Sequence, residues 1–176
     1  KIPKELLGKY TLNNKIPIID RFFNSKSNNN LIIWDKRRLD SWIKKNSETN
    51  INKGRGIANY DKVCLKWILN SIKKYNVNNK KIAVVGSTTP WIECILLNFN
   101  NDVTTIEYIP IKIEKNDYNL KYKNYFDFEK EKNEYDCIIS FSSIEHSGLG
   151  RYGDPLNPNG DLETMDAIYN NLKKNG

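Results

Sequence analysis

Apolar positions along residues 57–176 follow two patterns, unbroken runs and repeats of three or four residues. Residues 57–75 carry apolar side chains at helical spacing, which predicts an amphipathic helix. The segment KIAVVGS at 81–87 is an unbroken apolar run up to a glycine and predicts a buried strand. In TTPWIECILLNF, Thr89 can act as an N-cap and Pro90 takes the first helical position, so a helix is predicted directly after the turn. The predicted buried face of the first helix consists of Tyr60, Cys64, Trp67, Ile68, Ile72 and Tyr75.

Three more strands are predicted at residues 101–109, 120–128 and 134–142, and a closing helix follows with Asp161 as its N-cap. Because strands alternate with helices, the sequence predicts an α/β fold, a Rossmann-like three-layer sandwich with a mostly parallel sheet. The chain ends at Gly176, where a fifth strand would begin, so we expect a sheet truncated after its fourth strand and the helix that follows it. The predicted buried face of the closing helix consists of Leu162, Met165, Ile168, Tyr169 and Leu172.

Residues 1–50 show no clean period. Short apolar pieces such as IPIIDRFF and NLIIWD are separated by the Asn-rich break NSKSNNN. This region is predicted to be a loosely structured extension. The expected organisation is an N-terminal extension at 1–53 and a Rossmann-like domain at 54–176 whose C-terminal strands are missing.

The composition favours a folded protein in a reducing compartment. Hydrophobic residues make up 39% of the 176 positions, which argues against disorder. No apolar run approaches the roughly 18 residues of a membrane span, and the start KIPKELLGKY lacks the apolar core of a signal peptide. Cys64, Cys94 and Cys137 are widely spaced within apolar runs and fit neither a disulfide framework nor a zinc site. We therefore expect buried thiols and a cytoplasmic location.

The net charge of +7 is distributed unevenly. Residues 1–80 carry 18 Lys and Arg against 6 Asp and Glu, whereas residues 81–176 carry 10 against 15. A basic first half can attract nucleic acid, anionic lipid or an acidic substrate. No basic motif interleaved with aromatic residues is present, so the favoured interpretation is a solvated Lys- and Asn-rich surface, and nucleic acid is not expected as a partner.

Polar residues gather where the predicted strands end. Gly86 follows the first strand, Glu107 and Asp127 come at the ends of the second and third, and the loop SFSSIEHSGLGRYGDPLNPNGD at 140–161 follows the fourth. Ligands of open parallel sheets bind outside the carboxyl ends of the strands, so a site is predicted at this edge. Simpler interpretations stay open: Gly86 as a turn residue, Glu107 as a solvated acid, and Asp127 as a turn or cap residue.

The turn at Gly86 disfavours a phosphate ligand. It has one glycine instead of the G-x-G-x-x-G pattern, and Glu93 in the first turn of the following helix already complements the helix dipole. Glu107 follows Gly86 by 21 residues, a spacing at which an acid can accept both hydroxyls of an adenosine ribose. An adenosyl ligand without phosphates fits better, and S-adenosylmethionine (SAM) is one. Its sulfonium also suits the negative balance of residues 81–176.

The order of strand, glycine turn, second-strand acid and then YDCIISFSSIEH resembles class I SAM-dependent methyltransferases. VGSTTPWIE, VTTIEY and SSIEHSGLGRYGDPLNPNGD are similar, more closely, to the domain of unknown function 268 family, first defined on Caenorhabditis proteins and itself similar to those methyltransferases. This similarity covers about residues 54–176. The similarity implies a SAM site in which Gly86 and Ser87 lie at the methionine side of the cofactor. It implies that Glu107 binds the ribose and that Asp127 lies near the adenine. The residues implied to face the cofactor or the substrate are Ser142, Glu145 and His146.

Two features depart from the class I pattern. Val84 stands two residues before the glycine, where these enzymes usually have an acid. Thr88 and Pro90 stand where the later glycines of the turn would be. Both departures bear on cofactor affinity.

The loop at 140–161 offers groups for methyl transfer, which needs positioning and sometimes a base. His146 is the candidate base because an imidazole titrates near neutral pH, and Glu145 can orient the substrate or bind the sulfonium region. Arg151, Tyr152 and Asp154 can clamp an anionic or sugar-like substrate. The alternatives are a structural role for His146 and a turn that only holds its own shape. No fixed spacing supports a metal site, so no metal is expected.

These features favour a SAM-dependent methyltransferase that acts on oxygen or nitrogen of a small-molecule or glycan-type acceptor. One alternative is a non-catalytic Rossmann-like module of a larger glycan-pathway protein. Another is a nucleotide-sugar or NAD-binding enzyme, which the missing glycines disfavour. The oligomeric state is left open.

Overall fold

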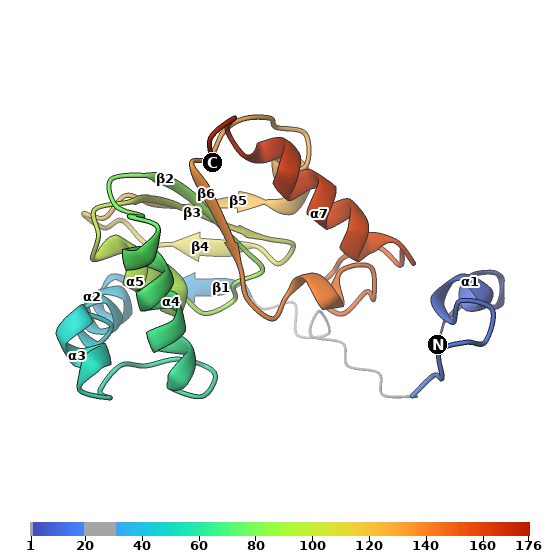
Figure 1. Ribbon diagram of the computed structural model, residues 1–176, viewed down its shortest axis with the longest axis horizontal. Coiled ribbons are helices and arrows are strands. Elements are labelled where there is room, and N and C mark those ends of the chain that lie inside the picture. Colours follow the sequence, from blue (N-terminus) through green and yellow to red (C-terminus); the bar gives the residue numbers. More distant parts are fainter. Residues whose placement is uncertain (1, 20–30) are drawn as a thin grey trace.

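Helices and strands alternate along residues 2–19 and 31–176, which are the residues that the computed structural model describes (Figure 1). In chain order the elements are α1 (Lys4–Tyr10), β1 (Ile32–Trp34), α2 (Lys36–Lys45), α3 (Glu48–Asn52), α4 (Val63–Lys74), β2 (Lys81–Val85), α5 (Trp91–Leu97), β3 (Asp102–Glu107), β4 (Ile111–Ile113), β5 (Leu120–Asn124), α6 (Tyr125–Phe128), β6 (Cys137–Ser140), a 3₁₀ helix (Ile144–His146) and α7 (Gly160–Asn171).

The main sheet has the strand order β5-β3-β2-β6, and each neighbouring pair is parallel. Ile82 of β2 pairs with Val103 on one side and Cys137 on the other. These strands lie within the four ranges predicted from the sequence, so the α/β class and the parallel sheet are confirmed. A second sheet, not predicted, consists of β1 and β4 in parallel, with Trp34 opposite Ile113.

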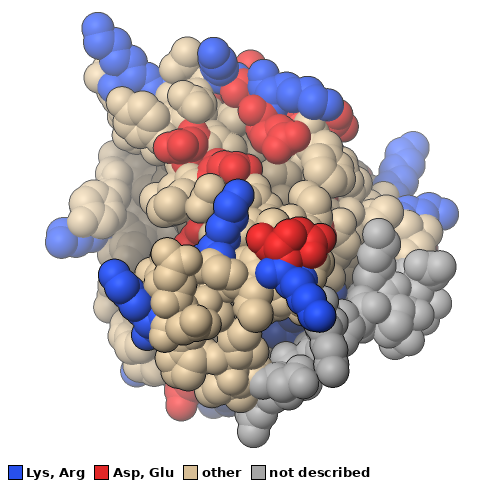
Figure 2. Space-filling view, turned by 90° about the vertical axis from the view of Figure 1, so that its right-hand side faces the viewer, with Lys and Arg blue, Asp and Glu red and all other residues tan. Residues whose placement is uncertain are grey.

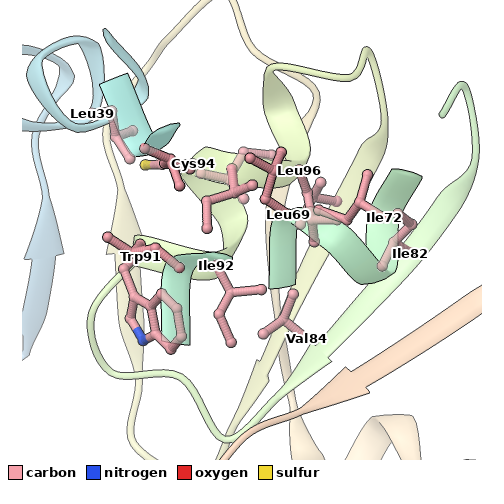
Figure 3. Packing of buried hydrophobic residues seen from close by; sticks show 14 of the residues in the cluster. Leu39, Leu69, Ile72, Ile82, Val84, Trp91, Ile92, Cys94 and Leu96 are labelled. Atoms are coloured by element: carbon pink, nitrogen blue, oxygen red, sulfur yellow. The ribbon is translucent and has the colours of Figure 1, made fainter. Parts of the chain in front are cut away.

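Helices cover both faces of the main sheet. Strand β2 is apolar on both sides, so both faces have to be shielded from water. Ile82 and Val84 belong to a first core cluster, which includes the apolar faces of α2, α4 and α5. Ala83 and Val85 belong to a second, smaller cluster with residues from α6 and α7. Figure 1 shows α4 and α5 on one side of β6 and α7 on the other. Figure 3 shows α5 and its neighbours in the first cluster at close range.

Residues 32–52 are regular structure packed into the first cluster, which corrects the loosely structured extension predicted there. Trp34 of β1, Leu39 of α2 and Ile51 of α3 are buried in that cluster. Asp35 caps α2, accepting a hydrogen bond from the backbone N–H of Arg38 at 2.8 Å. Elements of three to ten residues are too short to show a clear period, so the apolar pattern missed them. The break NSKSNNN lies outside the described residues.

Helix α4 is shorter than predicted, and only part of the predicted stripe is buried. Leu65 and Leu69 are buried in the first cluster together with Cys64 and Ile72. Trp67 and Tyr75, which were predicted to be buried, are exposed, and so is Tyr60 before the helix. The repeat of large aromatic residues was mistaken for the core-facing stripe.

The buried face predicted for α7 is wrong at three of its five positions. Leu162, Met165 and Tyr169 are exposed, whereas Thr164 and Asn171 are buried. These polar side chains are held inside by hydrogen bonds: the Thr164 hydroxyl donates to the Gly160 carbonyl, and Asn171 Nδ2 donates to the carbonyls of Phe128 and Ala167. Asn171 Oδ1 is buried without a hydrogen-bond partner, so only the hydroxyl of Thr164 and the amide nitrogen of Asn171 are satisfied. Hydrogen-bonded polar groups can be buried, so the apolar pattern alone did not fix the orientation of this helix.

The predicted caps are displaced. The N-cap of α5 is Pro90, one residue later than predicted, and that of α7 is Asn159. Asp161 lies in the first turn of α7, and its carboxylate accepts a hydrogen bond from the Leu162 N–H. Differences of one or two residues at helix ends are usual.

No helix among the described residues is long and apolar enough to cross a membrane. On the face drawn in Figure 2, acidic and basic side chains are interspersed instead of forming one continuous basic patch. The surplus of Lys and Arg in the first half of the sequence is therefore not gathered over this face, as far as the described residues show.

Candidate functional site

The β2–α5 turn is built around Gly86, which has a left-handed φ of +79°. A Cβ at this position would lie 1.6 Å from Oγ of Ser143 and 2.3 Å from its Cβ. Ser143 belongs to the loop after β6, so the absence of a side chain at Gly86 lets that loop approach the end of β2. Glycine is required at this position both by the backbone angle and by the close contact.

A cleft lies at the carboxyl ends of β2, β3 and β6. In open parallel sheets this edge is where ligands bind, at the point where the strand order reverses. The reversal here is at β2, since the chain adds β3 and β5 on one side and β6 on the other. The lining residues are Tyr60, Val85, Gly86, Thr88, Ile106, Glu107, Tyr108, Tyr125, Ser142, Ser143, His146, Ser147, Tyr152 and Asp154.

Glu107 lines this cleft as the last residue of β3. Its side chain is buried, and Oε1 accepts a hydrogen bond from the Tyr108 N–H at 2.8 Å. Burial raises the pKa of Glu107 to about 7, and the nearby charge of Asp154 acts in the same direction. The acid is therefore held in a poorly solvated place, which disfavours the interpretation of Glu107 as a solvated acid at a strand end.

The loop after β6 closes the cleft from the other side. Asp154 is buried, and its carboxylate oxygens accept hydrogen bonds from the backbone N–H groups of Gly150 and Tyr152 at 2.8 and 2.9 Å. The loop is thus held in shape by its own hydrogen bonds, which was the alternative to a substrate clamp in the sequence analysis. Asp154 of this loop also lines the cleft. At its base, Gly148 has φ +85°, and a Cβ there would lie 2.0 Å from the Asn157 carbonyl oxygen.

Helix α1 reaches the same loop from the start of the chain. The Tyr10 hydroxyl donates a hydrogen bond to the Gly148 carbonyl. Burial raises the pKa of Tyr10, and the charge of Asp154 adds to that effect. The N-terminal helix therefore takes part in holding the loop that covers the cleft.

Six of the predicted site residues come together in the cleft. They are Gly86, Glu107, Ser142, His146, Tyr152 and Asp154. The His146 ring lies 6.1 Å from the Tyr152 ring, centre to centre, in an edge-on arrangement. The site residues predicted from three separate segments of the sequence are thus neighbours at one edge of the sheet.

Four predicted site residues do not line the cleft. The Asp127 side chain is 71% exposed on α6, 3.9 Å from Lys130 Nζ. Glu145 is 57% exposed, accepts a hydrogen bond from the Ser142 hydroxyl at 3.0 Å, and has Oε1 4.0 Å from His146 Nε2. The Arg151 guanidinium lies over the Tyr152 ring, 4.9 Å from its centre.

Ser87, the fourth of these residues, is buried beneath the glycine turn. Its hydroxyl is within hydrogen-bond distance of the Thr89 carbonyl and of Glu93 Oε2, at 3.0 and 3.1 Å. Glu93 is fully buried and Oε1 has no hydrogen-bond partner. Burial raises the pKa of Glu93 to about 7. The sequence predicted a carboxylate that complements the helix dipole, but burial shifts this acid towards its neutral form.

Three tyrosines in the cleft were missed by the sequence reasoning. Tyr108 directly follows Glu107, and Tyr125 stands two residues before Asp127. Both tyrosines therefore lie at the ends of predicted strands, and this position could have identified them. Their rings are stacked 4.4 Å apart. Tyr60 lies before α4, and nothing in its sequence context indicates a place in the cleft.

Residues 79–176 match the model of a protein family described as Caenorhabditis protein of unknown function, DUF268. The chain belongs to this family. The segment matched to the DUF268 family contains all four strands of the main sheet and every cleft-lining residue except Tyr60. No curated protein and no solved structure matches the chain. The DUF268 match thus covers the cleft but assigns no chemistry to it.

The side chains of the cleft limit what it can bind. Two carboxyl groups, four tyrosines, one imidazole and several hydroxyls line it, and among the described residues no Lys or Arg does. Such a lining can hydrogen-bond hydroxyl groups and hold a flat ring or a cation, but it gives no counter-charge to a phosphate. No cluster of acidic, His or Cys side chains among the described residues has the arrangement of a metal site.

Proposed function

We propose that this chain binds SAM in the cleft of a Rossmann-like domain and transfers the methyl group to oxygen or nitrogen of a small-molecule or glycan-type acceptor. The observation that carries this proposal is Glu107, a buried acid at the end of β3 that lines a cleft next to the Gly86 turn of β2. The strand order β5-β3-β2-β6 supports it, because it corresponds to the first four strands of the 3-2-1-4-5-6 order.

The cleft residues fit an adenosyl group. The Glu107 carboxylate can accept hydrogen bonds from two ribose hydroxyls, because its two oxygens offer about four acceptor positions and the Tyr108 N–H occupies one of them at Oε1. The stacked pair of Tyr108 and Tyr125 offers an aromatic surface suited to a purine ring. Because Ser143 lies against Gly86, we assign Gly86 to the close approach of the loop and Ser87 to the support of the turn.

SAM, when bound, supplies an activated methyl carbon, so the protein has to position the acceptor and receive its proton. His146 lines the cleft and is the candidate base. Glu145 lies 4.0 Å from His146 Nε2 and can stabilise the imidazolium that forms. Tyr152 and Asp154 line the same side of the cleft and can hold acceptor hydroxyl groups.

The carboxyl groups disfavour the alternative of an NAD or nucleotide-sugar enzyme. A pyrophosphate in this cleft would face Glu107 and Asp154, and none of the described lining residues is a Lys or Arg. Like charges in a poorly solvated site repel strongly, so such a ligand would bind weakly. A non-catalytic module is distinguished from the proposed enzyme by ligand binding.

Calorimetric titration of the chain with SAM and S-adenosylhomocysteine (SAH) tests the proposal. We expect dissociation constants in about the micromolar range for the wild-type protein and loss of measurable binding in Glu107→Ala. Asp127→Ala is the matched control: it removes an acid at the next strand end that is exposed and outside the cleft, so binding should be retained.

Failure of both ligands to bind to folded wild-type protein would overturn the proposed function and favour the non-catalytic module. Equal binding by wild type and Glu107→Ala would overturn the assignment of the ribose site. Thermal unfolding of each variant shows whether it is folded, so loss of binding can be separated from loss of structure.

A further inference from the structure

The fixed charges in the described lining of the cleft are negative. Glu107 and Asp154 line it, and both side chains are nearly inaccessible to solvent. The basic side chain described next to it, Arg151, has its guanidinium over the Tyr152 ring and does not line the cleft. A poorly solvated pocket with two acids and, among its described lining residues, no Lys or Arg has a negative potential and favours positive charge.

The two carboxyl groups are fixed by separate backbone segments. Glu107 is held by the Tyr108 N–H at the end of β3, and Asp154 by the N–H groups of Gly150 and Tyr152 in the loop. The charge of Asp154 contributes to the raised pKa of Glu107, so the two acids repel each other across the cleft. A cation between them would relieve this repulsion, whereas a neutral ligand would leave it in place.

Aromatic rings complete a site of this kind. Tyr60, Tyr108, Tyr125 and Tyr152 all line the cleft. Tyrosine faces attract cations through the quadrupole of the ring, and sulfonium and quaternary ammonium groups are held in this way in water-poor pockets. The acids and the rings therefore favour the same kind of ligand, although they come from different parts of the chain.

We infer that Glu107 and Asp154 make the cleft selective for a cation, so that each acid strengthens binding of a sulfonium or ammonium ligand more than binding of its neutral counterpart. The inference rests on the proposed function, because the cation in question is the sulfonium of SAM and the neutral counterpart is SAH. Asp154 is then a specificity residue for the cofactor, in addition to its proposed contact with acceptor hydroxyl groups.

Calorimetric titration with SAM and SAH at pH 8 tests the inference, since Glu107 is mostly ionised there. The measured quantity is the ratio of the two dissociation constants in wild type, Asp154→Asn and Glu107→Gln. We expect each neutralising variant to weaken SAM relative to SAH by about tenfold, the effect of roughly one lost charge interaction in a partly buried site. Asp127→Asn, which neutralises an exposed acid outside the cleft, should leave the ratio unchanged.

The comparison of two ligands separates charge from loop structure. Asp154→Asn also loses a hydrogen-bond acceptor for the backbone N–H groups of the loop, which would weaken SAM and SAH alike. Equal weakening of both ligands, or an unchanged ratio, would overturn the cation selectivity while leaving the adenosyl site intact. If wild-type protein binds neither ligand, the proposed function fails and the inference fails with it.

Discussion

The two faces of the main sheet are packed in different ways. The face under α4 and α5 is mostly apolar, with Leu69, Ile72 and Leu96 buried in the first cluster (Figure 3). The face under α7 is smaller, and that helix presents the polar residues Thr164 and Asn171 to the interior. Apolar packing therefore dominates on the face covered by α4 and α5, whereas buried hydrogen bonds contribute more on the face covered by α7.

The cleft opens on the second, more polar face. Val85, Ile106 and Tyr125 belong to the second cluster, and each of them also lines the cleft. The Tyr125 hydroxyl donates to Thr164 Oγ1 at 3.0 Å, which joins the cleft wall to α7. The comparison shows that the second cluster, and not the first, forms the hydrophobic wall of the cleft together with a hydrogen bond to α7.

The largest effect should come from the face under α4 and α5. Leu96→Ala removes a fully buried side chain of α5 from the first cluster and leaves a cavity there. We expect a loss of about 2–5 kcal/mol in the free energy of unfolding, measured by urea denaturation. Leu162→Ala, on the exposed side of α7, is the control and should change stability by less than about 0.5 kcal/mol. Similar losses in the two variants would show that the faces do not differ in packing.

A second test concerns the acid buried in α5. The pKa of Glu93 is raised to about 7 from an ordinary value of 4.5, so the folded state keeps a proton that the unfolded chain releases. The contribution of Glu93 to the free energy of unfolding falls as the pH rises from about 4.5 to about 7. Above that range the cost of burying the ionised carboxylate is fully present. The ionisation of Glu93 should therefore make the wild-type protein less stable at pH 8 than at pH 5.

Glu93→Gln removes that cost and keeps an oxygen that can accept the Ser87 hydroxyl. We expect the variant to exceed wild type by up to roughly 3 kcal/mol at pH 8 and to match it more closely at pH 5. Urea denaturation at the two pH values measures this, with Glu129→Gln at an exposed position as control. Glu107 titrates in the same direction in both proteins, and its charge is a smaller cause of the raised pKa of Glu93, so the difference reports on Glu93 together with its coupling to Glu107. A variant less stable at pH 8 would mean that the carboxylate is satisfied in the fold.

The sequence predicted the parts of the fold that rest on unbroken apolar runs. The runs ending at Val85 and Glu107 are strands whose side chains are mostly buried, whereas the run ending at Ser140 is an edge strand whose side chains are partly buried. The parallel sheet then brings the strand ends to one edge, which is why Gly86, Glu107 and the loop at 140–161 could be placed together. Topology, once predicted, locates polar residues that are far apart in the chain.

Other features could not be read from the pattern. β1 is three residues long and depends on pairing with β4, which lies about 80 residues away. Asp127 comes after a short strand, and the single helical turn of α6 carries it out to solvent, whereas Tyr125 two residues earlier faces the cleft. A shift of two residues within one turn decides which side chain lines the site, and apolar spacing does not carry that information.

The smallest effect should come from the exposed apolar residues of α7, which the sequence pattern predicted to be buried. Met165 is 51% exposed, and the neighbouring buried position Ala167 is small. Met165→Ser therefore removes few contacts that the fold depends on, and we expect a change of less than about 0.5 kcal/mol in urea denaturation. A loss of about 2 kcal/mol or more would instead match the removal of a buried side chain. The α7 face would then be covered in solution, and the contrast between the two faces would have to be abandoned.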